Sequence, residues 1–134
     1  MKKRFAAAIN CMDGRIQIPV IEYMRSNYMI DCLDIITDAG PIRILSEGTD
    51  RTTIENIKKR LEISVVKHGS KIVAISGHHD CAGNPEKKET QLKQILSAIK
   101  VMKMWDLDVL IIGLWIDENW NVWKISDLIN ISGA

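Results

Sequence analysis

The sequence predicts an α/β fold: an open, mostly parallel sheet with helices on both faces. Short apolar runs alternate along the chain with longer segments whose apolar residues recur at helical spacing, as expected of strands joined by crossover helices. The runs are apolar at nearly every position, which indicates strands buried on both faces. Four parallel strands are expected, at residues 5–10, 32–37, 71–76 and 108–116.

Three helices are expected between these strands. The first, residues 19–27, has a proline near its start, where proline is favoured. The second covers residues 52–68, where apolar residues step at helical spacing and Gly69 is placed to end the helix. The third, residues 85–105, also opens on a proline and carries one apolar face.

The remaining segments are less regular. Residues 42–50 show no clear periodicity, and residues 46–49 are typical of a loop. Residues 122–125 are expected to return antiparallel as a short edge strand, and the last residues of the chain are expected to form one helical turn.

The expected strand order places two sequence clusters side by side. With right-handed crossovers and a reversal of winding after the second strand, the order is 2-1-3-4, and the switch point lies between the first and third strands. Ligands of open α/β sheets bind beyond the carboxyl ends of the strands at such a point. Cys11 follows the first strand, and His78 and Cys81 follow the third. We therefore expect these three side chains to converge.

Two thiols and one imidazole at one place predict a metal site. Three such ligands without a fourth are typical of a catalytic zinc site rather than a structural one. Water in the fourth position would become nucleophilic, or Asp13 could take that position and close the site. Arg15 is expected to hold Asp13 away from the metal through a directional ion pair, with Gly14 allowing a tight turn between them. Asp13 and Arg15 are thus candidate catalytic residues.

Several of these residues also have plainer interpretations. Residues 11–15 alone would fit a strand that ends in an Asp-Gly turn, and His-x-x-Cys alone is a weak signal for metal. His79 is expected to be a loop residue, and Asp80 is expected to make a local turn hydrogen bond. Cys32 is expected to be a small buried apolar residue. Trp120, in a turn, is expected at a subunit interface.

The composition is that of an ordinary globular chain and predicts a single domain over residues 1–134. Hydrophobic residues make up 46% of the chain. The net charge of +1 does not indicate binding to nucleic acid or to an anionic membrane. No stretch approaches the ~20 apolar residues that cross a bilayer. Three cysteines, an odd number, fit a metal site in a reducing compartment better than disulfides. We expect a cytoplasmic protein.

Taken together, the clusters resemble the signature of the β-class carbonic anhydrases, Cys-x-Asp-x-Arg followed much later by His-x-x-Cys. Residues 60–71 are similar to a helix of that family and the Gly-Val-Lys that follows it, and residues 113–117 resemble its Gly-x-x-Tyr-Asp. Residues 38–40, Asp-Ala-Gly, stand where the family has Asn-Ala-Gly, which places an extra negative charge near the site. The signature residues here are Cys11, Asp13, Arg15, His78 and Cys81.

The resemblance implies a zinc enzyme in which zinc-bound hydroxide adds to CO2 to give bicarbonate. Zn2+ would be held by Cys11, His78 and Cys81, with Asp13 and Arg15 as the catalytic pair. The family is built from dimers, so a homodimer or a higher homo-oligomer is expected. The chain looks like a short member that lacks the family's N-terminal helices and the glutamine that binds substrate in many members.

Three other functions stay open from the sequence. A hydrolase of carbonyl sulfide or carbon disulfide would use the same scaffold and metal. A zinc-binding module without turnover would also keep the three metal ligands. A thiol–disulfide redox protein would use Cys11 and Cys81, but the chain lacks Cys-x-x-Cys and this function would leave Asp13 and Arg15 without a role.

Overall fold

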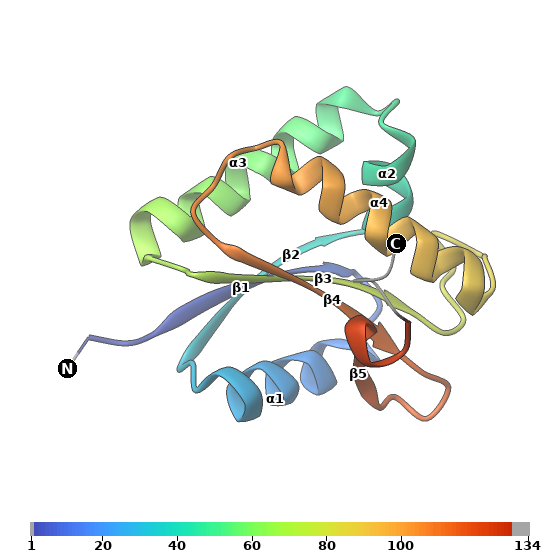
Figure 1. The fold of residues 1–134 in the computed structure, drawn as a ribbon, viewed down its shortest axis with the longest axis horizontal. Coiled ribbons are helices and arrows are strands. Elements are labelled where there is room, and N and C mark those ends of the chain that lie inside the picture. The colour runs from blue at the N-terminus through green and yellow to red at the C-terminus, as the bar shows by residue number, and fades with distance from the viewer. Residues whose placement is uncertain (1, 130–134) are drawn as a thin grey trace.

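The computed structural model describes residues 2–129 and contains a five-stranded sheet of order β2-β1-β3-β4-β5 (Figure 1). The first four strands are parallel, and β5 pairs with β4 in the antiparallel direction. The predicted fold class and strand order are therefore confirmed. The strands are β1 (Phe5–Cys11), β2 (Cys32–Asp38), β3 (Ile72–His78), β4 (Leu110–Ile116) and β5 (Val122–Lys124).

Helices cover both faces of the sheet, as expected. In Figure 1, α1 lies below the sheet, whereas α2, α3 and α4 lie above it. The helices are α1 (Gln17–Tyr28), α2 (Pro41–Glu47), α3 (Arg51–His68) and α4 (Lys88–Lys103), followed by a 3-10 turn, η1 (Ile125–Asp127). Between residues 2 and 129, no helix combines the length and the apolar character that a membrane crossing requires.

The core consists of two apolar layers, one on each face of the sheet. Ala7 and Ile9 of β1 pack into the layer between the sheet and helices α2, α3 and α4, while Ala6 and Ala8 pack into the layer between the sheet and α1. All four of these residues are fully buried. Since β1 and β3 occupy the middle of the sheet, both of their faces are covered, which explains their uninterrupted apolar runs.

Three local features differ from expectation. Residues 42–50 contain most of α2, which begins at Pro41 and ends where Gly48 adopts a φ of 72°; seven residues are too few to show a clear helical period. Helix α4 begins at Lys88 rather than residue 85, because residues 84–87 form a loop whose Glu86 carbonyl accepts a hydrogen bond from the Gln91 side chain. Cys32 is only half-buried, since β2 is an edge strand.

The C-terminal expectations are met in part. The edge strand ends at Lys124, one residue earlier than expected, because Ile125 begins the turn η1. The helical turn expected in the last residues of the chain lies outside the described residues.

Candidate metal centre

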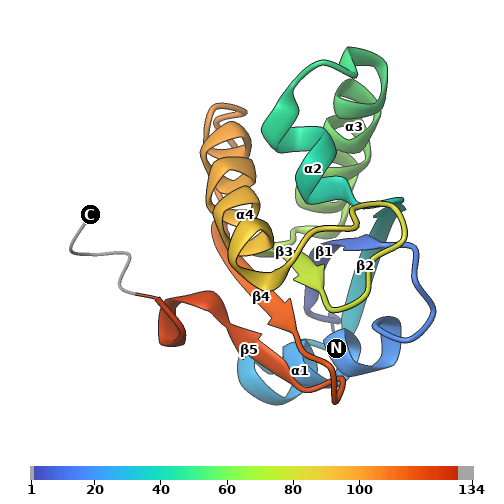
Figure 2. The same cartoon turned by 90° about the vertical axis from the view of Figure 1, so that its right-hand side faces the viewer.

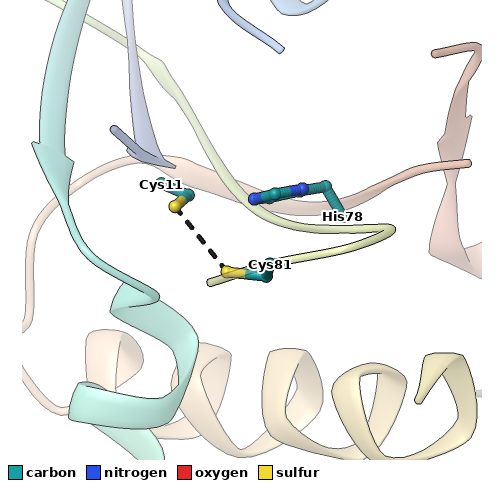
Figure 3. Close-up of side chains that lie close together, drawn as sticks. All are labelled: Cys11, His78 and Cys81. Carbon is teal, nitrogen blue, oxygen red and sulfur yellow. Dashed lines mark hydrogen bonds between the residues drawn. The ribbon is translucent and has the colours of Figure 1, made fainter. Parts of the chain in front are cut away.

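The two cysteines and the histidine meet at the carboxyl edge of the sheet. Cys11 is the last residue of β1, His78 is the last residue of β3, and Cys81 lies three residues further along the following loop. Strands β1 and β3 are paired neighbours. Figure 3 shows the three side chains pointing toward one another from these positions. Residues far apart in the chain are thus brought together by strand pairing.

The geometry of this cluster is compatible with one metal ion. The two sulfur atoms lie 3.7 Å apart, and one candidate ligand atom from each of the three residues lies within 4.8 Å of the other two. The cluster is buried, with Cys11 and Cys81 each 5% exposed and His78 1% exposed. Within residues 2–129, no other group of three or more His, Cys, Asp or Glu side chains meets the same distance condition.

The hydrogen bonding of His78 leaves one ring nitrogen for a ligand. Its Nδ1 lies 2.7 Å from the His79 carbonyl oxygen, to which only a protonated nitrogen can donate. Its Nε2 is buried and has no hydrogen-bond partner. An Nδ1–H held by a backbone carbonyl is the usual arrangement behind a histidine that binds metal through Nε2. His79 itself is an exposed loop residue, as expected, and contributes its carbonyl.

The two thiols share a hydrogen bond that shifts the pKa values of both. A hydrogen bond from Cys81 is the main reason that the pKa of Cys11 is lowered to about 4, against the opposing effect of burial; the neighbouring His78 lowers it further. The pKa of Cys81 is raised because it hydrogen-bonds the Cys11 sulfur and is itself buried. The pair therefore readily loses one proton, and a divalent cation would favour loss of the second. Two thiolates and one neutral imidazole fit zinc.

Asp13 and Arg15 form the ion pair that the sequence predicts. Arg15 donates from Nη2 to Oδ2 of Asp13 at 2.7 Å and from Nε to Oδ1 at 3.0 Å, which is a two-point contact. This hydrogen bonding is the largest cause that lowers the pKa of Asp13 to about 2 and raises the pKa of Arg15. Asp13 is not part of the cluster of three candidate ligands.

The turn between these two residues does not depend on glycine. Gly14 is not among the residues with positive φ, and a Cβ placed there would meet no atom within 4 Å. Gly14 is thus compatible with the turn, as expected, but the turn does not require a glycine at this position. The backbone N–H of Arg15 instead donates to Oδ1 of Asp13 at 2.9 Å, so the aspartate itself closes the turn.

Two further residues hold Arg15, and the sequence analysis predicted neither of these contacts. Asp80 accepts a hydrogen bond from Arg15 Nη1 through its carboxylate at 3.3 Å and one from Nη2 through its backbone carbonyl at 3.0 Å. The guanidinium carbon of Arg15 lies 4.5 Å from the ring centre of Trp120. Asp80 thus makes a long-range contact rather than the expected local one. Neither contact has a signal in the sequence, because the partners lie 65 and 105 positions from Arg15.

A partly buried hydrogen-bond network centred on the Gln17 side-chain amide supports the segment that carries Asp13. Gln17 donates from Nε2 to the carbonyl oxygens of Cys11 and Asp13, at 2.8 Å each. Its Oε1 accepts from Asn10, and Asn10 in turn accepts from the Ser76 hydroxyl of β3. Asn10 and Ser76 are fully or almost fully buried. The network therefore links β1 and β3 within two residues of Cys11 and His78, at the ends of these strands.

Gln91 of α4 performs a similar role for His78. Its Nε2 donates to the His78 carbonyl at 2.9 Å, and its Oε1 accepts from the His78 backbone N–H at 3.1 Å. The Gln91 side chain is 1% exposed. The buried Gln91 amide thus makes the two backbone hydrogen bonds to His78 that a neighbouring strand would otherwise make at the end of β3.

Close backbone contact fixes the loop that carries Cys81. A Cβ on Gly83 would lie 2.6 Å from the carbonyl carbon of Ala39, and a Cβ on Gly40 would lie 2.8 Å from the Gly83 carbonyl oxygen. Gly40 also has a φ of 65°. The loops after β2 and β3 therefore approach too closely for side chains. Asp38, whose negative charge was expected near the site, is paired with Arg60 of α3 at 3.1 Å.

The family model and three solved structures that match this chain all concern carbonic anhydrases. A family model described as "Putative carbonic anhydrase" matches residues 1–126. Among solved structures, a β-carbonic anhydrase from Trichomonas vaginalis superposes with a TM-score of 0.59 at 17% identity, covering 92% of this chain and 82% of that one. The β-carbonic anhydrase CcaA gives 0.56 at 15% identity, covering 94% and 82%.

A third solved structure belongs to a pair of tetrameric β-carbonic anhydrases from Sordaria macrospora. It gives a TM-score of 0.52 at 13% identity and covers 93% of this chain and 81% of that one. At such identities the likeness concerns the fold. No curated protein sequence matches the chain.

Proposed function

The chain belongs to the carbonic anhydrase family whose model it matches, and from this premise we propose that it is a zinc enzyme that hydrates CO2 to bicarbonate and a proton. The observation that carries the proposal is the buried cluster of two sulfurs and one unpartnered imidazole nitrogen. Cys11, Cys81 and His78 would hold the metal. The three donors leave room for a fourth ligand in a tetrahedral site.

Zinc bound by these residues would act as a Lewis acid that makes water nucleophilic near neutral pH. The remaining chemistry falls to Asp13 and Arg15. Because its pKa is about 2, Asp13 is ionised at neutral pH and can accept a hydrogen bond from the attacking water. Arg15 fixes the direction of the carboxylate. The water oxygen adds to the carbon of CO2, and one proton passes to solvent.

We also propose that residues 1–134 act as one domain and that the protein works in the cytoplasm as a homodimer or a higher homo-oligomer. The Sordaria enzymes of the same fold are tetrameric. Small molecules, rather than nucleic acid or membranes, are the proposed partners.

The experiment that tests this function combines metal analysis with substrate assays. Protein purified without chelator is expected to hold about one zinc per chain, and Cys81→Ser is expected to lose it. Cys32→Ser is the matched control, because Cys32 lies outside the cluster, and it is expected to retain zinc. Stopped-flow measurement at alkaline pH is expected to show CO2 hydration that Asp13→Asn removes.

Each alternative has its own result. Hydrolysis of carbonyl sulfide or carbon disulfide without CO2 hydration would replace the substrate and keep the site. Zinc in the cluster with no turnover of any of these substrates would identify a non-catalytic module. Absence of zinc together with a reversible disulfide between Cys11 and Cys81 would contradict the proposal altogether.

A further inference from the structure

Arg15 is held on three sides by residues from three separate segments. Asp13 binds it from the same loop, Asp80 binds it from the loop after β3, and the ring of Trp120 covers it from the hairpin between β4 and β5. The guanidinium is nonetheless at the surface, since the Arg15 side chain is 45% exposed. A long exposed side chain normally samples many rotamers, so this set of contacts restricts it strongly.

Two of the contacting residues have left-handed backbone conformations, which is unusual for the second of them, a tryptophan. Asp80 has a φ of 57° and Trp120 a φ of 63°. Left-handed conformations are uncommon outside glycine, asparagine and aspartate, and they are disfavoured for a residue as bulky as tryptophan. Such backbone strain persists where the surrounding structure enforces it, often at functional sites.

The hairpin turn that enforces the position of Trp120 is organised by Asp117. Its Oδ1 accepts from the backbone N–H groups of Asn119 and Asn121 at 2.9 Å each, and its Oδ2 accepts from the Trp123 indole at 2.8 Å. The backbone N–H of Trp120 donates to the Asp117 carbonyl, also at 2.9 Å. The backbone N–H groups of Asn119, Trp120 and Asn121 are therefore all bound to Asp117, the residue that follows β4.

Helix α1 supports the other side of Trp120. The indole is partly buried and packs against the apolar layer on the α1 face of the sheet. Pro19 and Tyr23 of α1 line the same surface hollow as Trp120. In Figure 2 the β4–β5 hairpin lies beside α1. The ring is thus held between α1 and the hairpin and presents a face to Arg15.

We propose that Trp120 and Asp80 are positioning residues that hold Arg15, and through it Asp13, away from the metal so that the fourth position stays open to small ligands. The inference rests on the proposed zinc site. Carboxylate oxygen is a common zinc ligand, and Asp13 is only two residues from Cys11. Without Arg15 in place, the Asp13 carboxylate competes with incoming anions for that position.

The test uses the full chain loaded with Co2+, whose visible absorption reports exchange of a ligand, and azide as the probe. Trp120→Leu is expected to weaken azide binding about two- to fivefold, the range that corresponds to the energy of one cation–π contact at an exposed site. Trp120→Phe keeps an aromatic face and is expected to restore most of the affinity. Asp80→Asn is expected to weaken binding in the same direction, and asparagine tolerates the left-handed backbone there.

Two controls separate positioning from a general structural effect. Glu118→Ala changes an exposed residue of the same turn and is expected to leave azide affinity unchanged. In an Arg15→Gln background, Trp120→Leu is expected to have no additional effect, because its action passes through Arg15.

The possible results differ for the two proposals. The positioning role alone would be overturned if Trp120→Leu lowered azide affinity by the same factor in the wild-type and Arg15→Gln backgrounds. It would also be overturned if cobalt-loaded Trp120→Leu and Asp80→Asn both bound azide as tightly as the wild-type protein. Failure of the wild-type protein to take up about one cobalt per chain would overturn the proposed function and this inference together.

Discussion

Gln91→Ala tests how strongly the site depends on its buried supports. The Gln91 side chain makes three hydrogen bonds, two to the backbone of His78 and one to the Glu86 carbonyl. At about 1 kcal/mol net for each hydrogen bond, truncation is expected to lower the free energy of unfolding by about 3 kcal/mol. Alanine is a strong helix former, so the loss reflects these contacts rather than a weakened α4.

Urea unfolding followed by circular dichroism, with chelator present, measures this loss without a contribution from metal binding. Lys93→Ala is the control, because Lys93 is an exposed residue of the same helix; it is expected to change stability by less than about 0.5 kcal/mol. Zinc affinity is expected to fall about 10–100-fold in Gln91→Ala, as for other residues that orient a metal-binding histidine. A Gln91→Ala protein as stable as Lys93→Ala would refute the reasoning.

Two other predictions concern the loops around the site. Arg15→Gln is expected to return the pKa of Asp13 from about 2 toward its ordinary 3.8, measured by carboxyl NMR titration of metal-free protein. The lowered pKa contributes stability that is fully present above pH 3.8 and lost as pH falls through about 2; a titration curve unaffected by the substitution would contradict this. Gly83→Ala is expected to cost about 1–3 kcal/mol in urea unfolding, whereas Gly14→Ala costs less than about 0.5 kcal/mol; equal effects would show that the close approach at Gly83 is unimportant.

The sequence was sufficient to predict the sheet and the convergence of the candidate ligands. Buried parallel strands leave long apolar runs, and the handedness of crossovers restricts the order in which they pair. Once β1 and β3 are neighbours, Cys11 and His78 at their ends are close without any further information. The Asp13–Arg15 ion pair is also local, so two positions of separation were enough to expect it.

The supporting contacts could not be predicted in this way. Whether Trp120 reaches Arg15 depends on where a five-residue turn points in space and on a left-handed backbone that tryptophan rarely adopts. The role of Gln91 could not be predicted from the helical pattern, because its hydrogen bonds to His78 follow from the position of α4 beside the end of β3. The expected interface role of Trp120 is untested and is compatible with its contact to Arg15.

X-ray absorption spectroscopy of the zinc-loaded protein tests the central claim most directly. If Cys11, Cys81 and His78 hold the metal, the spectrum will show two sulfur atoms at ~2.3 Å and a nitrogen at ~2.0 Å, with one further light atom. A zinc ion surrounded only by nitrogen and oxygen, or by a single sulfur, would contradict the account.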